Sequence, residues 1–417
     1  MSKYAVVGHH YWNRPGGSQF VCAAATYALQ TIGYTPILTS VGPIDSGNYY
    51  DWFGIDLSKY TSISLTSLKL RAFGIYLRLL IWRAIKKAID KYSAQLIFTD
   101  ECTYKPLIEY IKNREIMLVE YIHFPMEIYI DKRFKGTGLY YNEDPYITER
   151  YSKFPMNIYW QIYVKSLPRY MRENPFEISS LVLANSKWTA ELVKQIHGEP
   201  PEILNPPIPP NIEVVNKTKD WISRNNSVVM LGRFSEEKRY HWVIDRVLPK
   251  LKKEIDDVKL YILGDAKTKT SLNYLNRIEY LAKKNNFKTS RSLNLEANVY
   301  LIANASRSTI KNIMDSSKIF LHATINEHWG IAVTEAMARG LPTVVHKSGG
   351  LWSDLIEYGT HGLGYSDPEE AVKAVTKLLT DEKTWNYYSS KSIEKARSLT
   401  IEEFVAKLAV LMSTKMH

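Results

Sequence analysis

Residues 326–342 have the sequence NEHWGIAVTEAMARGLP, and this stretch decides the fold of the C-terminal half of the chain. The pattern predicts a helix that begins near Gly330, carries Glu335 on its second turn and ends at Gly340. Pro342 stands where a helix cannot continue, and a short apolar run typical of a buried strand comes directly after it. Helices and strands that alternate in this way indicate a parallel α/β sheet.

The amino end of this helix is suited to binding an anion. The backbone N–H groups of Gly330, Ile331 and Ala332 have no partner within the helix, and a glycine there lets an anion approach the backbone closely. Glu327 lies just before them. The same pattern also fits an ordinary helix in which Glu327 is a cap and Glu335 a solvated side chain, so both interpretations remain open.

Two further loops of the C-terminal half also follow a strand and precede a helix. The run 228–231 leads into Gly232, Arg233 and then Lys238, and the third loop, 348–350, is Ser-Gly-Gly. Arginine can bind phosphate oxygens through two N–H groups and lysine adds a point charge, although ordinary surface charges would explain either residue alone. Because open α/β sheets bind ligands at the carboxyl ends of their strands, we expect the three loops to share one site.

Strand-like and helix-like runs alternate along the whole chain and predict two domains. Candidate strands lie at 4–8, 95–98, 117–122, 180–184, 227–231, 259–263, 319–322 and 342–346. The segment 205–211, NPPIPPN, holds more proline than a helix or strand tolerates and predicts the crossover between domains. We expect Rossmann-like doubly wound domains at 1–205 and 206–394, with a closing helix at about 395–417 that packs back on the first.

Near the N-terminus, a Gly16-Gly17-Ser18 turn follows the first strand and precedes an alanine-rich segment. Ser18 is the predicted N-cap of the resulting helix and Gly33 its C-terminal stop.

Composition narrows the possible classes of protein. The 417 residues are 45% hydrophobic and carry a formal net charge of +11, so we expect a large core and an anionic partner. The chain has no apolar run long enough to span a membrane, and residues 1–8 resemble a strand more than a signal peptide, which predicts a cytoplasmic protein. Cys22 and Cys102 lack partners at metal-ligand spacing, so neither zinc nor a disulfide is expected. No nucleic-acid-binding motif accompanies the positive charge, and we expect no nucleic-acid partner.

The segment from Leu68 to Lys87 contains six basic residues and no acidic one. Taken as a single helix, it has a core face made of Leu70, Phe73, Leu77, Leu80, Ile81 and Ala84. The opposite face carries the cations Lys69, Arg71, Arg78, Arg83, Lys86 and Lys87 together with Ile75, Leu79 and Trp82. This mixture suits peripheral contact with an anionic membrane surface, although packing under a neighbouring helix would also explain it. The aromatic segment 157–172 is a second candidate membrane element, or part of the core.

Together these motifs are similar to those of glycosyltransferase family four. The resemblance is carried by Gly232-Arg233 with Lys238, by Glu327 and Glu335 with seven residues between them, by the Glu-Ala-Met-Ala-x-Gly-x-Pro continuation and by the late Ser-Gly-Gly. It spans nearly the whole chain. The segments 121–125 (YIHFP) and 184–189 (ANSKWT), with the early Gly-Gly-Ser, resemble the branch of dolichol-pathway α-1,2-mannosyltransferases.

The resemblance implies an α/β GT-B fold, in which two facing doubly wound domains enclose a deep cleft. It implies that Arg233 and Lys238 neutralise the leaving diphosphate, that Glu327 holds sugar hydroxyls, and that His123 faces the reacting sugar. The implied donor-binding residues are Gly17, Gly232, Leu301 through its backbone, Gly330, Ile331, Ala332 and, on the ribose, Glu335. The chain departs from the family pattern at Trp329, where phenylalanine is usual, and at Arg239, where glycine usually follows the lysine.

The expected function is a retaining transfer of a hexose from a nucleotide sugar, GDP-mannose by resemblance, onto a lipid-linked or membrane-associated glycan at the cytoplasmic face of a membrane. Neither a metal nor another cofactor is expected, because two cationic side chains and a helix terminus would stabilise the leaving diphosphate. Alternatives are a UDP-sugar-dependent transferase with a soluble acceptor, a related phosphorylase, an inactive partner subunit, and a non-catalytic basic protein that binds membranes or nucleic acid.

Overall fold

A computed structural model describes residues 3–68, 74–101, 104–172 and 174–414. The chain forms two compact units, of which the first comprises Met1–Asn142, Phe154–Asn211 and Leu399–His417, and the second Glu143–Lys153 and Ile212–Ser398. The proline-rich segment stays with the first unit, because the Asn211 side-chain amide donates to the carbonyl oxygen of Asp51 at 3.0 Å. Residues 143–153, which the sequence pattern did not separate from their neighbours, belong to the second unit.

The first unit is built on a seven-stranded parallel sheet with the order β3-β2-β1-β4-β5-β6-β7. Its strands are β1 (Lys3–Gly8), β2 (Tyr34–Ser40), β3 (Thr61–Ser64), β4 (Leu96–Thr99), β5 (Met117–Ile122), β6 (Leu181–Ala184) and β7 (Glu202–Ile203). The chain leaves β1 toward β2 and leaves β4 toward β5, which is the opposite direction across the sheet. Right-handed crossovers therefore put helices on both faces, as a doubly wound sheet requires.

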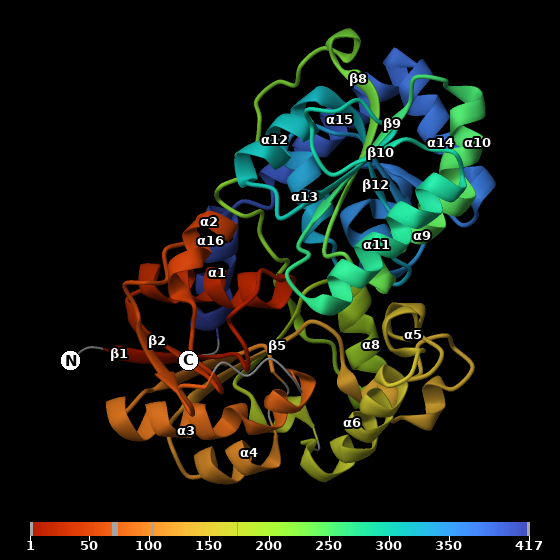
Figure 1. Cartoon of the computed structure of the whole chain (residues 1–417). Coiled ribbons are helices and arrows are strands. Elements are labelled where there is room, and N and C mark those ends of the chain that lie inside the picture. The colour runs from red at the N-terminus through yellow and green to blue at the C-terminus, as the bar shows by residue number, and fades with distance from the viewer. Residues whose placement is uncertain (1–2, 69–73, 102–103, 173, 415–417) are drawn as a thin grey trace. The chain divides into compact units, whose positions relative to one another are not determined.

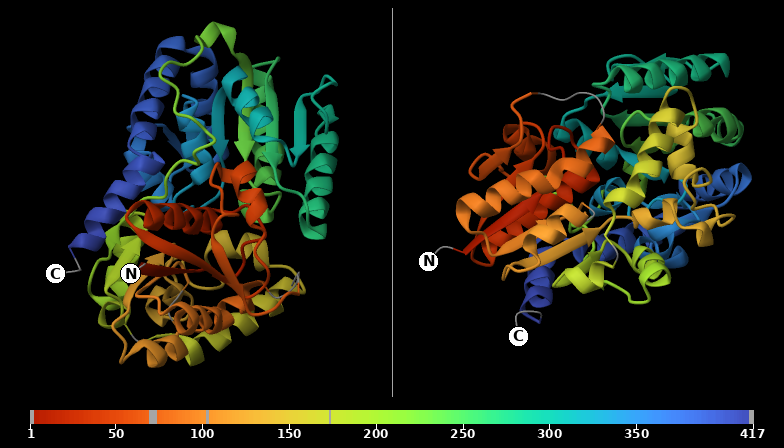
Figure 2. Two further views of the ribbon diagram at one scale, coloured as in Figure 1. Left: turned by 90° about the vertical axis from the view of Figure 1, so that its left-hand side faces the viewer. Right: turned by 90° about the horizontal axis from the view of Figure 1, so that it is seen from below.

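The helices of the first unit lie on both faces of its sheet. They are α1 (Gly17–Thr31), α2 (Tyr49–Phe53), α3 (Ile81–Tyr92), α4 (Lys105–Ile111), α6 (Met156–Tyr170), α7 (Pro175–Ile178), α8 (Lys187–His197) and α16 (Ile401–Ser413). Figure 1 and Figure 2 show α1 on one face and α3 with α4 on the other. The C-terminal helix α16 packs against α1.

The second unit has its own seven-stranded parallel sheet, with the order β10-β11-β9-β8-β12-β13-β14. Its strands are β8 (Asn225–Leu231), β9 (Lys259–Gly264), β10 (Thr289–Ser290), β11 (Val299–Ala303), β12 (Ser317–His322), β13 (Thr343–His346) and β14 (Leu363–Tyr365). Its helices are α5 (Pro145–Tyr151), α9 (Tyr240–Trp242), α10 (Leu248–Glu254), α11 (Lys269–Lys284), α12 (Arg307–Ser316), α13 (Ile331–Ala338), α14 (Pro368–Thr380) and α15 (Glu382–Arg397). Figure 1 shows α10, α11 and α14 on one face of this sheet and α12, α13 and α15 on the other.

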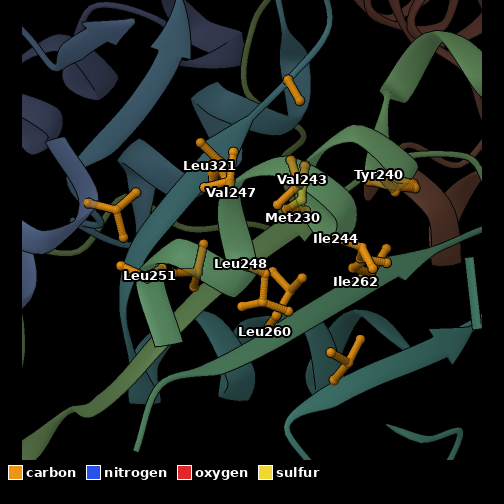
Figure 3. Close-up of a cluster of buried hydrophobic side chains, with 14 of the residues drawn as sticks. Met230, Tyr240, Val243, Ile244, Val247, Leu248, Leu251, Leu260, Ile262 and Leu321 are labelled. Carbon is orange, nitrogen blue, oxygen red and sulfur yellow. The ribbon is translucent and has the colours of Figure 1, made fainter. Parts of the chain in front are cut away.

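A continuous apolar core joins this second sheet to the helices of one face. Figure 3 shows Met230, Leu260 and Ile262 from the strands packed against Ile244 and Leu248 from the helical segment that follows β8. All five side chains are at most 2% exposed. Burial of this kind contributes about 1.5–3 kcal/mol for each large aliphatic side chain, which fixes the strand ends from which the loops of the site emerge.

The expected helix over residues 68–87 is wrong in its geometry. Residues 69–73, which include Lys69, Leu70, Arg71 and Phe73, lie outside the described part of the chain. Residues Gly74–Leu80 form a 3₁₀ helix and only Ile81–Tyr92 is α-helical, so the two stretches do not share one rotation per residue. Leu79 is accordingly buried at 9% exposure, whereas Leu80, expected in the core, is 37% exposed.

The second candidate membrane element has one face in the core and another exposed to solvent. Within α6, Trp160, Tyr163, Val164 and Leu167 are buried. Cys22 is also buried, and Cys102 lies outside the described residues.

None of the described helices is both long enough and apolar enough to cross a membrane.

The cap of α1 differs from the expected one. Gly16, in an extended conformation, is the N-cap, and Ser18 lies inside the helix, where its hydroxyl donates to the Gln19 side chain at 3.2 Å. Gly33 follows the helix with φ +98°, a left-handed conformation that favours glycine, as its predicted role as a stop requires.

Candidate active site

Three loops meet at the carboxyl ends of β8, β12 and β13, which are neighbours in the second sheet. The backbone N–H of Asn326 donates to the Ser348 hydroxyl at 2.8 Å, and the N–H of Leu351 donates to the carbonyl oxygen of Glu327 at 3.1 Å. The loop that begins at Gly232 joins them through Lys238, whose ammonium group donates to Glu327 at 2.7 Å. The three loops therefore lie together at one edge of the sheet, as expected.

Gly349 is required for this close approach. A Cβ atom at this position would lie 2.4 Å from the carbonyl oxygen of Glu327, and the residue has φ +70°. Any side chain at this position would clash with the backbone of the neighbouring loop, and the positive φ would strain the backbone of a residue other than glycine. The Ser-Gly-Gly sequence is thus a packing requirement of the loop that carries Glu327.

Glu327 lies at the centre of the site. Its Oε2 atom accepts from Lys238 at 2.7 Å and lies 2.9 Å from Nε2 of His322, and its side chain is 12% exposed. Burial alone would raise the pKa of Glu327, but Lys238 and His322 hold it well below its usual value of 4.5. Glu327 is therefore ionised at neutral pH. Burial would lower the pKa of Lys238, yet Glu327 raises it, so both partners are charged.

Arg233 lies in the same loop as Lys238 and is more open to solvent. Its guanidinium donates to Glu237 at 3.2 Å, and its side chain remains 38% exposed. Gly232 precedes it, and a Cβ atom there would lie 2.9 Å from the Tyr240 hydroxyl. The glycine thus lets the loop pass close to Tyr240, while Arg233 keeps N–H groups that can bind a ligand.

Helix α13 begins beside this cluster. Its cap residue, Gly330, has φ +91° and no side chain with which to bind the first-turn amides, among them those of Ile331 and Ala332. The helix ends at Ala338, close to the predicted stop at Gly340, which has φ +69°. Glu335 lies on its second turn but is 5% exposed and 3.0 Å from the Arg307 guanidinium. It is thus a buried ion-pair partner and not the solvated side chain of the ordinary interpretation.

Leu301 lies within β11, in register with Ile262 of β9, and it is fully buried. The strand continues to Ala303, so Leu301 lies inside the strand and not in the loop that follows it. Its backbone contact with a nucleotide base remains a prediction.

The two departures from the family pattern have clear structural settings. Arg239 has φ +53°, which explains why glycine is the usual residue there, since other residues seldom adopt this conformation. Its guanidinium lies 4.9 Å from the centre of the Trp242 ring, a stabilising cation–π contact. Trp329 is 4% exposed and fills the space before Gly330.

Residues 143–153 bring groups to the site that the sequence pattern did not reveal. Helix α5 packs against the turn Glu236–Lys238. The Asn326 side-chain amide donates to Asp144 at 3.1 Å, and the Tyr146 ring lies 4.8 Å from that of His328. Burial raises the pKa of Asp144 to about 6. No motif marks this segment, because only tertiary packing brings it to the second unit.

Gly17 and His123 belong to the first unit. Gly17 is the first residue of α1, and His123 directly follows β5, with Nε2 3.2 Å from Oδ2 of Asp100. Asp100 and Glu101 follow β4 and were missed by sequence analysis, as were His9 and His10, which follow β1. These four residues could have been found by the pattern that was used for the second unit, namely polar residues that directly follow a predicted strand.

Residues 213–395 match the family described as Glycosyl transferases group 1. A GDP-Man:Man(3)GlcNAc(2)-PP-Dol alpha-1,2-mannosyltransferase of Eremothecium gossypii is 28% identical over 178 residues, or 42% of this chain and 30% of that protein. A mannosylfructose-phosphate synthase of Agrobacterium fabrum is 29% identical over 176 residues, or 41% of this chain and 37% of that protein. The aligned part spans 30% to 46% of the length of the mannosyltransferases that match, in Eremothecium, mouse, Dictyostelium and Candida.

A crystal structure of a glycosyltransferase from Rickettsia africae matches 100% of this chain and 99% of its own, with a TM-score of 0.67 at 16% identity. At that identity the likeness concerns the fold, which is the GT-B class with two doubly wound sheets. The match to the glycosyl transferases group 1 covers residues 213–395, and these residues carry all three loops and helix α13 of the candidate site.

Proposed function

We propose that this chain is a retaining glycosyltransferase that transfers mannose from GDP-mannose to a lipid-linked or membrane-associated glycan, at the cytoplasmic face of a membrane. The observation that carries the proposal is the cluster of Arg233, Lys238 and Glu327 beside the amino end of α13. Two cations and first-turn backbone amides that no cap side chain binds are suited to a diphosphate, and an ionised, buried carboxylate is suited to sugar hydroxyls.

The chemical task is to stabilise negative charge on the departing diphosphate while the anomeric carbon becomes cation-like. Arg233, Lys238 and the amides of Ile331 and Ala332 would do so as preorganised donors, which act most strongly where water is excluded. The leaving phosphate would take the proton of the attacking hydroxyl on the same face of the sugar, which retains the anomeric configuration. Neither a metal nor another cofactor takes part in this scheme.

The donor is inferred from relatives. Several matching proteins are named GDP-Man-dependent alpha-1,2-mannosyltransferases, which favours GDP-mannose and a lipid-linked acceptor. The mannosylfructose-phosphate synthase favours a second candidate, transfer to a soluble sugar phosphate. Both candidates use the same site in the second unit and differ only in the acceptor.

A thermal-shift and transfer assay tests the donor. We expect GDP and GDP-mannose to raise the melting temperature, because a ligand at 100 times its dissociation constant adds about 2.7 kcal/mol to the stability of the folded state. UDP and UDP-glucose, as matched controls, should have less effect. We also expect mannosyl transfer to continue in EDTA.

The results separate the parts of this proposal. A melting temperature that responds to UDP but not to GDP would overturn the donor and keep the enzyme class. Activity that EDTA abolishes and magnesium or manganese restores would overturn metal independence. A protein that no nucleoside diphosphate stabilises would contradict a transferase function.

An anionic membrane is the partner we propose for the first unit. Phe154, just before α6, and Ile158 and Ile162 within it are 79%, 47% and 55% exposed. Ile158 and Ile162, four residues apart, lie on one face of α6, which Lys165 and Arg169, both exposed, continue. Helix α6 contains no acidic residue. Apolar side chains flanked by cations suit the boundary between acyl chains and anionic headgroups.

The described part of the segment from Leu68 to Lys87 contributes fewer exposed cations to such a surface than the sequence suggested. Arg83 and Lys87 are exposed, whereas Arg78 donates to the sulfur of Met126 and lies 3.5 Å from Glu101. We therefore propose that Arg83 and Lys87 of α3 supplement the exposed face of α6.

Flotation with vesicles that contain phosphatidylglycerol tests this surface. We expect wild-type protein to float and the double variant Ile158→Glu/Ile162→Glu to remain unbound, because each substitution replaces apolar area with a charge of the wrong sign. Arg83→Glu/Lys87→Glu should weaken binding, most clearly at low salt, where screening is least. Ile222→Glu, at a residue of the second unit that is 83% exposed, is the matched control and should float normally. If wild-type protein does not float, a soluble acceptor becomes the better proposal.

A further inference from the structure

A buried cluster of imidazoles and carboxylates lies in the first unit, and of its members only His123 was assigned a role by resemblance. His9 and His10 follow β1, Asp100 and Glu101 follow β4, and His123 follows β5; these three strands are neighbours in the sheet. The side chains of His9, Asp100 and Glu101 are at most 2% exposed. Charged groups are buried in this way only when they are closely paired.

Asp100 bridges two histidines. Its Oδ1 atom lies 2.8 Å from Nδ1 of His9, and its Oδ2 atom lies 3.2 Å from Nε2 of His123. Burial alone would raise the pKa of Asp100, but His9 and His123 lower it far below its usual value. A carboxylate that stays ionised can only accept hydrogen bonds, so both imidazoles must present an N–H group to it.

Gln19 fixes the state of His9 from the other side. The Gln19 side-chain nitrogen donates to the carbonyl oxygen of Tyr11 at 2.9 Å, which determines which end of the amide is the donor. The same nitrogen lies 2.9 Å from Nε2 of His9, which must therefore accept. In this arrangement Nδ1 of His9 is directed at Asp100 and Nε2 of His9 at the Gln19 amide.

His123 is held by its backbone and by its ring. Its carbonyl oxygen accepts from the Asn185 side chain at 3.0 Å, and its ring lies edge-on to Tyr121 at 5.0 Å. The side chain is 25% exposed, whereas that of Asp100 behind it is 2% exposed. With Nε2 engaged by Asp100, Nδ1 is the ring nitrogen left for a ligand, and no hydrogen bond within the described residues engages it.

We propose that Asp100 is a positioning residue that holds His123 in the Nε2–H tautomer, so that Nδ1 accepts a hydrogen bond from a hydroxyl group of a carbohydrate substrate. The state of one imidazole nitrogen is set by the partner of the other, and here the partner is an ionised, buried carboxylate. The substrate class rests on the proposed function, but the tautomer of His123 does not.

Asp100→Asn tests the proposal, since it preserves the shape of the side chain. The side-chain oxygen of the new asparagine can still accept a hydrogen bond from Nδ1 of His9, because Gln19 holds Nε2 of His9. With its oxygen on His9, the asparagine turns its NH₂ group toward Nε2 of His123. We expect His123 to change to the Nδ1–H tautomer, which long-range ¹H–¹⁵N correlation spectra of histidine-labelled protein report directly. The His123 signals are identified as those that are missing from the spectrum of His123→Gln. Glu120→Gln is the matched control, because Glu120 is an equally buried carboxylate of the neighbouring strand that pairs with Arg172 at 2.7 Å.

The kinetic expectation is a fall in kcat of about 10-fold in Asp100→Asn, because the loss of one hydrogen bond to the reacting substrate corresponds to a factor of this size. The stabilisation by nucleoside diphosphates should be unchanged. If hydrolysis of the donor without acceptor falls equally, the hydroxyl belongs to the donor sugar; if only transfer falls, it belongs to the acceptor.

Two results would overturn the proposal: a His123 tautomer that is the same in wild type and Asp100→Asn, or a kcat of Asp100→Asn no lower than that of Glu120→Gln. If the protein has no transferase activity but the His123 tautomer still changes in Asp100→Asn, Asp100 remains a positioning residue and only the proposed function is overturned.

Discussion

Replacing Arg233 with alanine is expected to lower kcat/KM for transfer by on the order of 100-fold, while the protein stays folded. The guanidinium would stabilise the charge that develops on the departing diphosphate, and loss of one preorganised donor of this kind costs roughly 10²–10³ in rate. Because the Arg233 side chain is 38% exposed, its removal leaves no deeply buried charge without a partner. Steady-state kinetics with the nucleotide sugar, together with the melting temperature, measure both effects.

Lys238→Ala should reduce the rate similarly but also destabilise the protein, since it removes the cation at 2.7 Å from the buried Glu327. Lys283→Ala is the matched control: Lys283 also pairs with a carboxylate, Glu279 at 2.8 Å, and both residues lie on α11. Wild-type turnover in both Arg233→Ala and Lys238→Ala would end the assignment of this site.

Glu327→Gln is expected to have the second large effect, a fall in kcat/KM of about 100-fold. The carboxylate holds Lys238 in place and is the group proposed to accept from sugar hydroxyls, so its neutralisation affects both the phosphate and the sugar side of the site. The amide also leaves the Lys238 cation buried without its partner, which should cost roughly 3 kcal/mol of stability at pH 7.

The stability effect of Glu327→Gln should depend on pH with a definite sign. The pKa of Glu327 is depressed in the folded protein, so its contribution to stability is fully present above the unfolded value of 4.5 and is lost as the pH falls below it. The difference in unfolding free energy between wild type and variant should therefore shrink toward acidic pH. A difference that stays constant from pH 7 to pH 3 would contradict the ionised pair. Asp367→Asn, at the exposed N-cap of α14, is a control for general acid effects.

Much of the fold could be predicted because its signals are local. The strands expected at 117–122 and 319–322 are β5 and β12 within two residues, since a buried parallel strand is a short apolar run. Helix α13 was predicted from its glycine boundaries, which the left-handed φ values of Gly330 and Gly340 explain. The same local logic failed over residues 68–87, where a constant helical rotation was assumed across a 3₁₀ segment.

The sequence by itself determined which residue types stand directly after each strand of the second unit, and hence the chemistry of Arg233, Lys238 and Glu327. Only the tertiary structure decided that Lys238 pairs with Glu327, 89 residues away, and that Asp100 joins His9 to His123 across 91 and 23 residues. The physical reason is that backbone preferences and apolar periodicity act over a few residues. Ion pairs and hydrogen-bonded chains instead depend on the order of strands in the sheet, which no local pattern specifies.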